Sequence, residues 1–242
     1  MEFIDDDFAS LTSGMSPAVS SFHYRFLDEE KKPFLLVLPG GGYCHISGEK
    51  EGRVIAEWAE SLGFHAGILS YQVQPVEKEK LLQELEKIKK FLQAEEKIDQ
   101  IFVMGFSAGA HLAGLFSCLG EPVVAGMILA YPVVTFEQDC RHQGSAENFL
   151  GPDYTPANCH TYSLENLVTA TTPPAFIWHT AEDGSVPVKN SLLLAASLAQ
   201  QQIPFDLHIF PEGHHGLGML QGTAHTRQWI KLLEHWLQEQ RK

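Results

Sequence analysis

Cysteine is scarce in this chain, with four residues among 242. They are too few for a disulfide scaffold and too far apart for a C-x-x-C metal site. The twelve histidines show no H-E-x-x-H or similar spacing of metal ligands. The sequence therefore predicts no disulfide framework, no metal and no bound cofactor. The cysteines are Cys44, Cys118, Cys140 and Cys159.

Basic residues and long apolar runs are also in short supply. Lysine and arginine number 17 against 30 aspartates and glutamates, so the formal charge of −13 repels the phosphates of nucleic acids. No run approaches the roughly 18 apolar residues of a membrane helix, and Met1–Asp7 is acidic where a signal peptide is basic. We expect a cytoplasmic protein with no membrane and no nucleic-acid partner. A homo-oligomer is compatible with this composition.

Apolar runs typical of buried strands alternate with stretches of helical spacing, such as Glu51–Leu62 and Val76–Ala94. This alternation favours one α/β domain over residues 1–242, with a mostly parallel central sheet and helices on both faces. Residues 1–17 are expected to be a loosely held lead-in, followed by an antiparallel edge strand over Val19–Phe26. Buried strands are predicted at Phe34–Leu38, Phe64–Tyr71, Gln100–Met104, Ala125–Tyr131, Ala175–Thr180 and Phe205–Phe210.

The most informative stretch is Gly105-Phe106-Ser107-Ala108-Gly109, between a predicted strand and a predicted helix. Glycines two residues to either side of Ser107 permit a sharp turn that brings strand and helix close together. The turn exposes the Ser107 hydroxyl, a candidate nucleophile, above the edge of the sheet. The Ala108 amide lies at the start of the helix, where it can stabilise an anion.

Three successive glycines, Gly40–Gly42, follow the strand predicted at Phe34–Leu38. Such a run lets backbone amides point at a ligand, so Gly41 and Gly42 would complete an oxyanion hole with Ala108. A phosphate-binding loop is the other use of a glycine-rich turn, but no Gly-Lys-Ser or Gly-Lys-Thr follows at the required spacing.

Two further candidate residues also follow predicted strands. Asp183 comes shortly after Ala175–Thr180, and His215 comes shortly after Phe205–Phe210. The carboxyl ends of parallel strands share one edge of a sheet, so Ser107, Asp183 and His215 should meet there in the chain order of a nucleophilic triad. His215 would accept the serine proton, and Asp183 would hold the imidazole in the right tautomer.

Position along the chain leaves two of these assignments open. Glu182 can replace Asp183 as the acid, and His214 can replace His215 as the base. His111 lies one helical turn beyond the serine, and we expect it to brace the turn from below.

Residues 136–172 interrupt the alternation of strands and helices. They mix glycines, prolines and aromatic residues without sustained periodicity, and such a long excursion in a compact domain is usually functional or mobile. We expect a small cap over the site, with Tyr154, Asn158 and Tyr162 contributing to specificity. A plain surface loop is the alternative.

Together these stretches resemble the α/β-hydrolase superfamily, and more narrowly the small bacterial esterases that look like acetylxylan esterases and are related to hormone-sensitive lipase. In that family the histidine lies in a G-x-H-G setting and the acid shortly precedes a Val-Pro pair, which favours His215 and Asp183. Pro39 departs from the pattern, because lipase-like relatives carry histidine there. The resemblance covers most of the chain, through Pro39–Tyr43, Ser47–Gly52, Gly105–His111, Thr172–Val188 and Phe210–Gly218.

The resemblance implies a serine esterase that hydrolyses short acyl esters of small molecules, including acetyl groups on sugars, with no cofactor. A serine peptidase of the prolyl-oligopeptidase type uses the same triad order, but it would normally need an extra domain or a basic anchor for the peptide terminus. A non-catalytic binding protein on the same scaffold would normally lack a triad member. We therefore predict a carboxylic ester hydrolase that acts through an acyl-enzyme.

Overall fold

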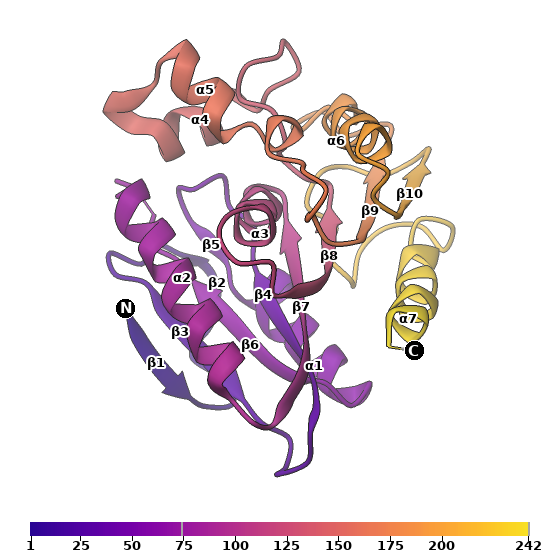
Figure 1. Ribbon diagram of the computed structural model, residues 1–242. Coiled ribbons are helices and arrows are strands. Elements are labelled where there is room, and N and C mark those ends of the chain that lie inside the picture. Colours follow the sequence, from indigo (N-terminus) through magenta and orange to yellow (C-terminus); the bar gives the residue numbers. More distant parts are fainter. Residues whose placement is uncertain (74, 242) are drawn as a thin grey trace.

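The computed structural model describes residues 1–73 and 75–241, and its eight-stranded sheet has the order β1-β3-β6-β4-β7-β8-β9-β10 (Figure 1). Neighbouring strands are parallel except β3 and β6, which confirms the predicted α/β fold with a mostly parallel sheet. The strands are β1 (Glu2–Asp5), β3 (Ser21–Arg25), β4 (Lys32–Leu38), β6 (His65–Ser70), β7 (Ile98–Phe106), β8 (Val124–Ala130), β9 (Ala175–Thr180) and β10 (Phe205–Phe210).

The two faces of the sheet build two separate cores, because successive side chains on a strand point to opposite sides. On β4, Phe34, Leu36 and Leu38 pack into the first core. Leu35 and Val37 pack into the second. The first core is closed by α2 (Lys78–Ala94), α3 (Ala108–Cys118) and α6 (Lys189–Gln200), and the second by α1 (Val54–Ser61) and α7 (Gln228–Gln240).

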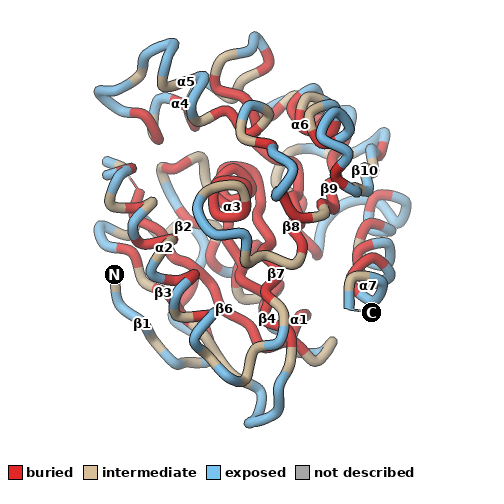
Figure 2. Tube along the Cα trace, in the orientation of Figure 1, coloured by how far each residue is buried: buried red, intermediate tan, exposed pale blue. Residues whose placement is uncertain are grey.

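Helix α3 is buried along most of its length, as the red trace at the centre of Figure 2 shows. It has apolar and small residues on all sides, which is the pattern of a helix enclosed by other elements. The sheet covers it on one side. Because α3 begins directly after Ser107, the start of this rigid helix determines where the serine lies.

The expectation of a loosely held lead-in over residues 1–17 is wrong. Strand β1 pairs parallel with β3, so β3, predicted as the edge strand, is flanked on both sides. A second, two-stranded antiparallel sheet joins β2 (Ser13–Met15) to β5 (Ile46–Ser47). Phe8 and Leu11, which lie between β1 and β2 in the chain, are buried in the second core. These are isolated apolar residues among polar ones, so their anchoring has no periodic signal in the sequence.

The segment predicted as one helix over Glu51–Leu62 has two parts. The chain first makes a π-helical turn over Glu49–Arg53 and then continues as α1. Glu51 and Gly52 are buried within the turn. The wider turn therefore brings an acidic side chain to the inside of the molecule, which regular amphipathic spacing does not predict.

Residues 136–172, called the cap segment from here on, contain short helices that a search for periodicity misses. They are α4 (Gln143–Leu150), α5 (Pro156–Tyr162) and 3-10 turns at Gly151–Asp153 and Leu164–Asn166. Each α-helix makes only about two turns, too few for a pattern of apolar spacing. The side-chain amide of Asn148 on α4 donates to the Gly42 carbonyl at 2.8 Å. The cap segment therefore contacts the run Gly40–Gly42, called the glycine loop from here on.

Candidate active site

The turn between β7 and α3 places Ser107 in a conformation that few residues adopt. Its φ is 53° and its ψ is −119°, and its amide donates to the Ala130 carbonyl at 3.0 Å. A Cβ on Gly105 would lie 2.3 Å from the Gly109 carbonyl oxygen, and one on Gly109 would lie 2.1 Å from the Leu38 carbonyl oxygen. Glycine is required at both positions because the backbones approach so closely.

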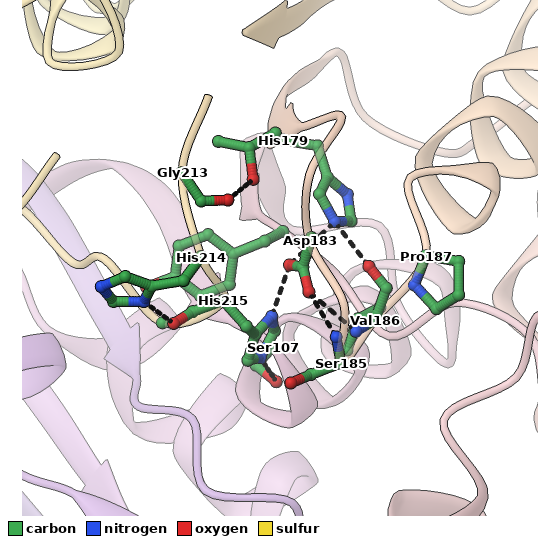
Figure 3. Close-up of polar contacts among 12 residues, drawn as sticks. Ser107, His179, Asp183, Ser185, Val186, Pro187, Gly213, His214 and His215 are labelled. Carbon is green, nitrogen blue, oxygen red and sulfur yellow. Dashed lines mark hydrogen bonds and ion pairs between the residues drawn. The ribbon is translucent and has the colours of Figure 1, made fainter. Parts of the chain in front are cut away.

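Ser107, His215 and Asp183 come together at the carboxyl ends of β7, β10 and β9 (Figure 3). The Ser107 hydroxyl lies 2.7 Å from His215 Nε2, and His215 Nδ1 lies 2.6 Å from Asp183 Oδ2. The carboxylate accepts from Nδ1, so Nε2 is free to accept the serine proton. The three residues form one continuous chain of hydrogen bonds that ends at a hydroxyl.

The neighbouring alternatives lie outside this chain. The Glu182 carboxylate accepts the Gly213 amide at 3.3 Å and does not contact either histidine through a hydrogen bond within the described residues. His214 Nδ1 donates to the His215 carbonyl at 2.7 Å (Figure 3). The geometry therefore connects Asp183 and His215 to the serine, and leaves Glu182 and His214 beside them.

Asp183 is buried and surrounded by donors. Its Oδ1 accepts the amides of Ser185 and Val186, each at 2.9 Å. Burial by itself raises the pKa of Asp183, but hydrogen bonds from His179 and His215, the positive charge of His215 and the Val186 amide outweigh it. The net result is a pKa well below the usual range, so the carboxylate is charged when the imidazole becomes protonated.

His179, which sequence reasoning missed, lies behind Asp183. Its Nε2 is 3.2 Å from Asp183 Oδ2 and 2.9 Å from the Val186 carbonyl, and its Nδ1 is 2.8 Å from the Ser191 hydroxyl. Both partners of Nε2 are acceptors, so the proton is on Nε2 and the ring holds the carboxylate from behind. Its only sequence signal is a polar residue inside the apolar strand β9.

The glycine loop and the start of α3 present unused backbone donors. Within the described residues, the amides of Gly41, Gly42 and Ala108 have no hydrogen-bond partner. Gly41 has φ of 140° and Gly42 has φ of 62°, and a Cβ on Gly41 would lie 1.9 Å from the His45 carbonyl oxygen. Gly41, Gly42 and Ser107 line one cavity of about 290 Å³. An anion in that cavity would meet free amides and the positive end of a helix.

A buried glutamate, Glu51, connects the glycine loop to the loop after β10 that carries His215, residues 211–218, called the histidine loop. Its Oε2 accepts the Gly40 amide at 2.9 Å, and its Oε1 accepts the Tyr131 hydroxyl at 2.6 Å. The same hydroxyl accepts the Gly218 amide at 2.9 Å, and the Tyr131 ring lies 5.0 Å from that of His215. Sequence reasoning noted the segment Ser47–Gly52 without assigning Glu51 a contact, because an acidic residue in a helical stretch usually faces solvent.

His111 joins α3 to the glycine loop and to the cap segment. Its Nδ1 lies 2.7 Å from the Tyr43 hydroxyl, and its Nε2 lies 2.7 Å from the Tyr162 carbonyl. The carbonyl can only accept, so Nε2 donates and Nδ1 accepts from tyrosine. Burial lowers the pKa of His111 to about 4, against a smaller upward effect of the Tyr162 carbonyl. The ring is neutral at physiological pH and acts as a connector.

The cavity beside Ser107 is lined by glycines and by polar or titratable side chains. Among the described residues no leucine, isoleucine, phenylalanine or methionine lines it. The described residues also hold no cluster of three or more His, Cys, Asp or Glu side chains able to bind a metal ion. No helix in the described part of the chain has the length and apolar character to cross a bilayer. The polar side chains on the cavity wall include His45, Ser47, Lys50, Glu51, His142 and Ser185.

Three known proteins are similar to this chain over most of its length. An endo-1,4-beta-xylanase B from Butyrivibrio fibrisolvens is 35% identical in an alignment of 219 residues, and the match covers 81% of this chain and 34% of that protein. An acetylxylan esterase from Xylanibacter ruminicola is 29% identical in an alignment of 224 residues, and the match covers 88% of this chain and 47% of that protein. The chain thus spans a third to a half of the length of these curated relatives.

The third similar protein is an acetyl ester-xyloside bifunctional hydrolase from Caldicellulosiruptor lactoaceticus, whose crystal structure is known. It has a TM-score of 0.84 and 36% identity to this chain, and the match covers 93% of this chain and 89% of that one. These similarities confirm the resemblance to acetylxylan-esterase-like α/β-hydrolases. The model of the prolyl oligopeptidase family matches residues 69–242. The chain belongs to this family, on the α/β-hydrolase fold.

Proposed function

We propose that the protein is a serine carboxylic ester hydrolase that acts through an acyl-enzyme on short-chain acyl esters, including acetylated carbohydrates. The observation that carries this proposal is the unbroken chain of hydrogen bonds from the Ser107 hydroxyl through His215 to Asp183, at 2.7 Å and 2.6 Å. A serine hydroxyl is a poor nucleophile until a base accepts its proton. Here the base is His215, and its Nε2 lies within hydrogen-bond distance of the Ser107 hydroxyl.

Acylation begins when Ser107 Oγ attacks the ester carbonyl carbon and its proton passes to His215 Nε2. The charge that develops on the carbonyl oxygen is bound by the free amides of Gly41, Gly42 and Ala108. Each such donor is worth about 3 to 4 kcal/mol of transition-state stabilisation. The imidazolium returns its proton to the departing alkoxide, and an acyl-serine and an alcohol result.

Deacylation repeats these steps with water as the nucleophile. His215 removes a proton from water, the hydroxide attacks the acyl-serine, and the proton returns to Ser107 as the carboxylic acid leaves. Asp183 stays charged throughout because the hydrogen bonds around it keep its pKa low. It stabilises the imidazolium and keeps Nδ1 protonated, so Nε2 always faces the reacting atoms.

The cavity supports a short acyl group and a polar alcohol. Its volume of about 290 Å³ lies at the small end for ligand pockets, and no large aliphatic side chain lines it within the described part of the chain. A long acyl chain would therefore find no large aliphatic side chain to pack against there. Relatives whose names refer to acetylxylan and to an acetyl ester support the same substrate class.

The first test is labelling with a fluorophosphonate, followed by the intact mass and by turnover of phenyl acetate. We expect the wild type to gain one phosphonyl group. Ser107→Ala should gain none, and its turnover should fall by at least roughly 10³-fold. Ser117→Ala is the matched control, because Ser117 is a buried serine on the same helix whose hydroxyl bonds to the Ala113 carbonyl. An unlabelled, inactive but folded wild type would reject the proposal in favour of a binding protein.

The family name makes peptide hydrolysis the second candidate. A peptidase that acts at the end of a chain needs a fixed group that binds the peptide terminus, and the same triad would then cleave dipeptide amides. Comparing kcat/KM for phenyl acetate with that for a dipeptide 4-nitroanilide separates the two candidates. Turnover of the anilide at a rate equal to that of the ester would favour the peptidase.

A further inference from the structure

His142 belongs to the cap segment, yet it lines the same cavity as Ser107 and His215. It is the N-cap of α4: its Nδ1 accepts the Ser145 amide at 3.2 Å and lies 2.7 Å from the Ser145 hydroxyl. Ser145 is completely buried, so two bonds to a fixed residue hold the ring. The imidazole is therefore oriented before any substrate binds.

These bonds also determine which nitrogen of His142 carries the proton. A backbone amide can only donate, so Nδ1 is unprotonated and the neutral ring carries its proton on Nε2. Burial, with the charge of His215 adding to it, lowers the pKa of His142 and favours the neutral ring. Within residues 1–73 and 75–241, Nε2 has no hydrogen-bond partner. His142 thus lines the cavity and carries one N–H donor that is unused within these residues.

We propose that His142 determines specificity by donating a hydrogen bond from Nε2 to an oxygen of the alcohol portion of the substrate. This inference rests on the proposed ester hydrolysis and adds the group that recognises a polyhydroxylated alcohol. The acyl carbonyl oxygen already has the amides of Gly41, Gly42 and Ala108 available to it. The ring and hydroxyl oxygens of a sugar need donors elsewhere, and His142 supplies one that is free and pre-oriented.

Two acetyl esters test this assignment because they give the same acyl-enzyme and differ only in the alcohol. Phenyl acetate has an alcohol with no acceptor besides the ester oxygen. A methyl xyloside with one acetyl group offers ring and hydroxyl oxygens. The measured quantity is the ratio of kcat/KM for the xyloside acetate to kcat/KM for phenyl acetate, because kcat/KM reports on steps up to acylation and excludes the shared deacylation.

Two variants of His142 separate the free donor from the helix cap. In His142→Asn the shorter side chain keeps an acceptor for the Ser145 amide, as asparagine does at many N-caps, and removes the donor from the cavity. In His142→Gln the side-chain amide reaches about as far as Nε2 and keeps an N–H donor there, but it does not cap α4 in the same way. His160→Asn is the control, since His160 is an exposed cap histidine bonded to Glu137 and does not line the cavity.

We expect the ratio to fall roughly tenfold in His142→Asn, as for a lost hydrogen bond between neutral groups, and to remain within about threefold of wild type in His142→Gln. His142→Gln should instead show the lower melting temperature. An unchanged ratio in His142→Asn, or an equal fall in both variants, would overturn the assignment. If the wild type hydrolyses phenyl acetate but not the xyloside acetate, the assignment falls and the esterase remains; if it hydrolyses neither, the proposed function falls as well.

Discussion

Single residues distant from the serine in the sequence hold the two loops of the site in position. Glu51 receives the Gly40 amide with one carboxylate oxygen and the Tyr131 hydroxyl with the other. The Tyr131 hydroxyl in turn accepts the Gly218 amide, three residues after His215. One buried carboxylate therefore acts on both the glycine loop and the histidine loop. His179 likewise holds the Asp183 carboxylate in position from behind, through its Nε2.

We predict that Glu51→Ala lowers both stability and activity. The change leaves the Gly40 amide and the Tyr131 hydroxyl without their acceptor, and each unsatisfied buried donor costs about 1 to 3 kcal/mol of unfolding free energy. The glycine loop would lose a fixed position, so kcat/KM for phenyl acetate should fall at least about tenfold. Urea unfolding and steady-state kinetics measure the two effects.

The control for Glu51 is Glu49→Gln on the same π-helical turn. Glu49 is a half-exposed residue that pairs with Arg53 at 3.0 Å on the surface, and removing such a pair costs 0 to about 1 kcal/mol. A Glu51→Ala protein that is destabilised but retains full kcat/KM would mean that Glu51 supports the fold without positioning the loop.

At the scale of elements, the cap segment is attached to the rest of the site at several points. Asn148 on α4 donates to the Gly42 carbonyl, and the Phe149 ring lies 5.0 Å from the Tyr43 ring. His111 on α3 bonds to Tyr43 on one side and to the Tyr162 carbonyl at the end of α5 on the other. The cap segment, the glycine loop and α3 therefore share one buried histidine.

This histidine predicts a pH dependence of stability with a definite sign. The pKa of His111 falls from an ordinary value of 6.5 to about 4 in the folded protein, because burial disfavours the charged ring. Its contribution is fully present above pH 6.5 and is lost as the pH falls toward 4, since the unfolded chain then binds a proton that the native state does not. By pH 4.5 the loss is about 2 to 3 kcal/mol.

The measurement compares the wild type with His111→Gln in urea at pH 7 and pH 4.5. The advantage of the wild type in unfolding free energy should shrink by about 2 to 3 kcal/mol between the two pH values. His235→Gln serves as the control, because His235 is exposed on α7 with its side chain 73% accessible. An advantage that stays constant with pH would mean that His111 is not held neutral by burial.

For the whole molecule, the organisation as a single domain over residues 1–242 stays a prediction. All four tryptophans belong to the second core or pack against it, and Trp178 stacks on Trp229 with ring centroids 4.7 Å apart. Tryptophan fluorescence therefore reports on the face covered by α1 and α7, whereas far-ultraviolet circular dichroism reports on all helices, the cap segment included.

We expect the two signals to give the same urea midpoint, since one cooperative unit loses both cores together. Strand β4 contributes alternate side chains to the two cores, which physically couples them. Separate midpoints, with the dichroism changing first, would divide the chain into a core and an independently melting cap segment.

Much of this fold could be predicted from the sequence because the signals are local. Apolar runs marked β9 and β10 with the bounds the structure has, and flanking glycines marked the turn at Ser107, where no side chain fits. The lead-in was misjudged because β1 is a partly exposed strand whose pairing depends on β3. The cap helices were missed because two turns carry too little periodicity.

The sequence by itself determined the alternating strands and helices outside the lead-in and the cap segment, the glycine-flanked serine and the loops that follow the strands, since each depends on residues adjacent in the chain. Only the tertiary structure decided which acid and which histidine lie within hydrogen-bond distance of one another. It alone placed Glu51 against Tyr131, 80 positions away. It also put His142 of the cap segment on the wall of the cavity that Ser107 lines. Such contacts depend on the packing of distant segments, which no local pattern encodes.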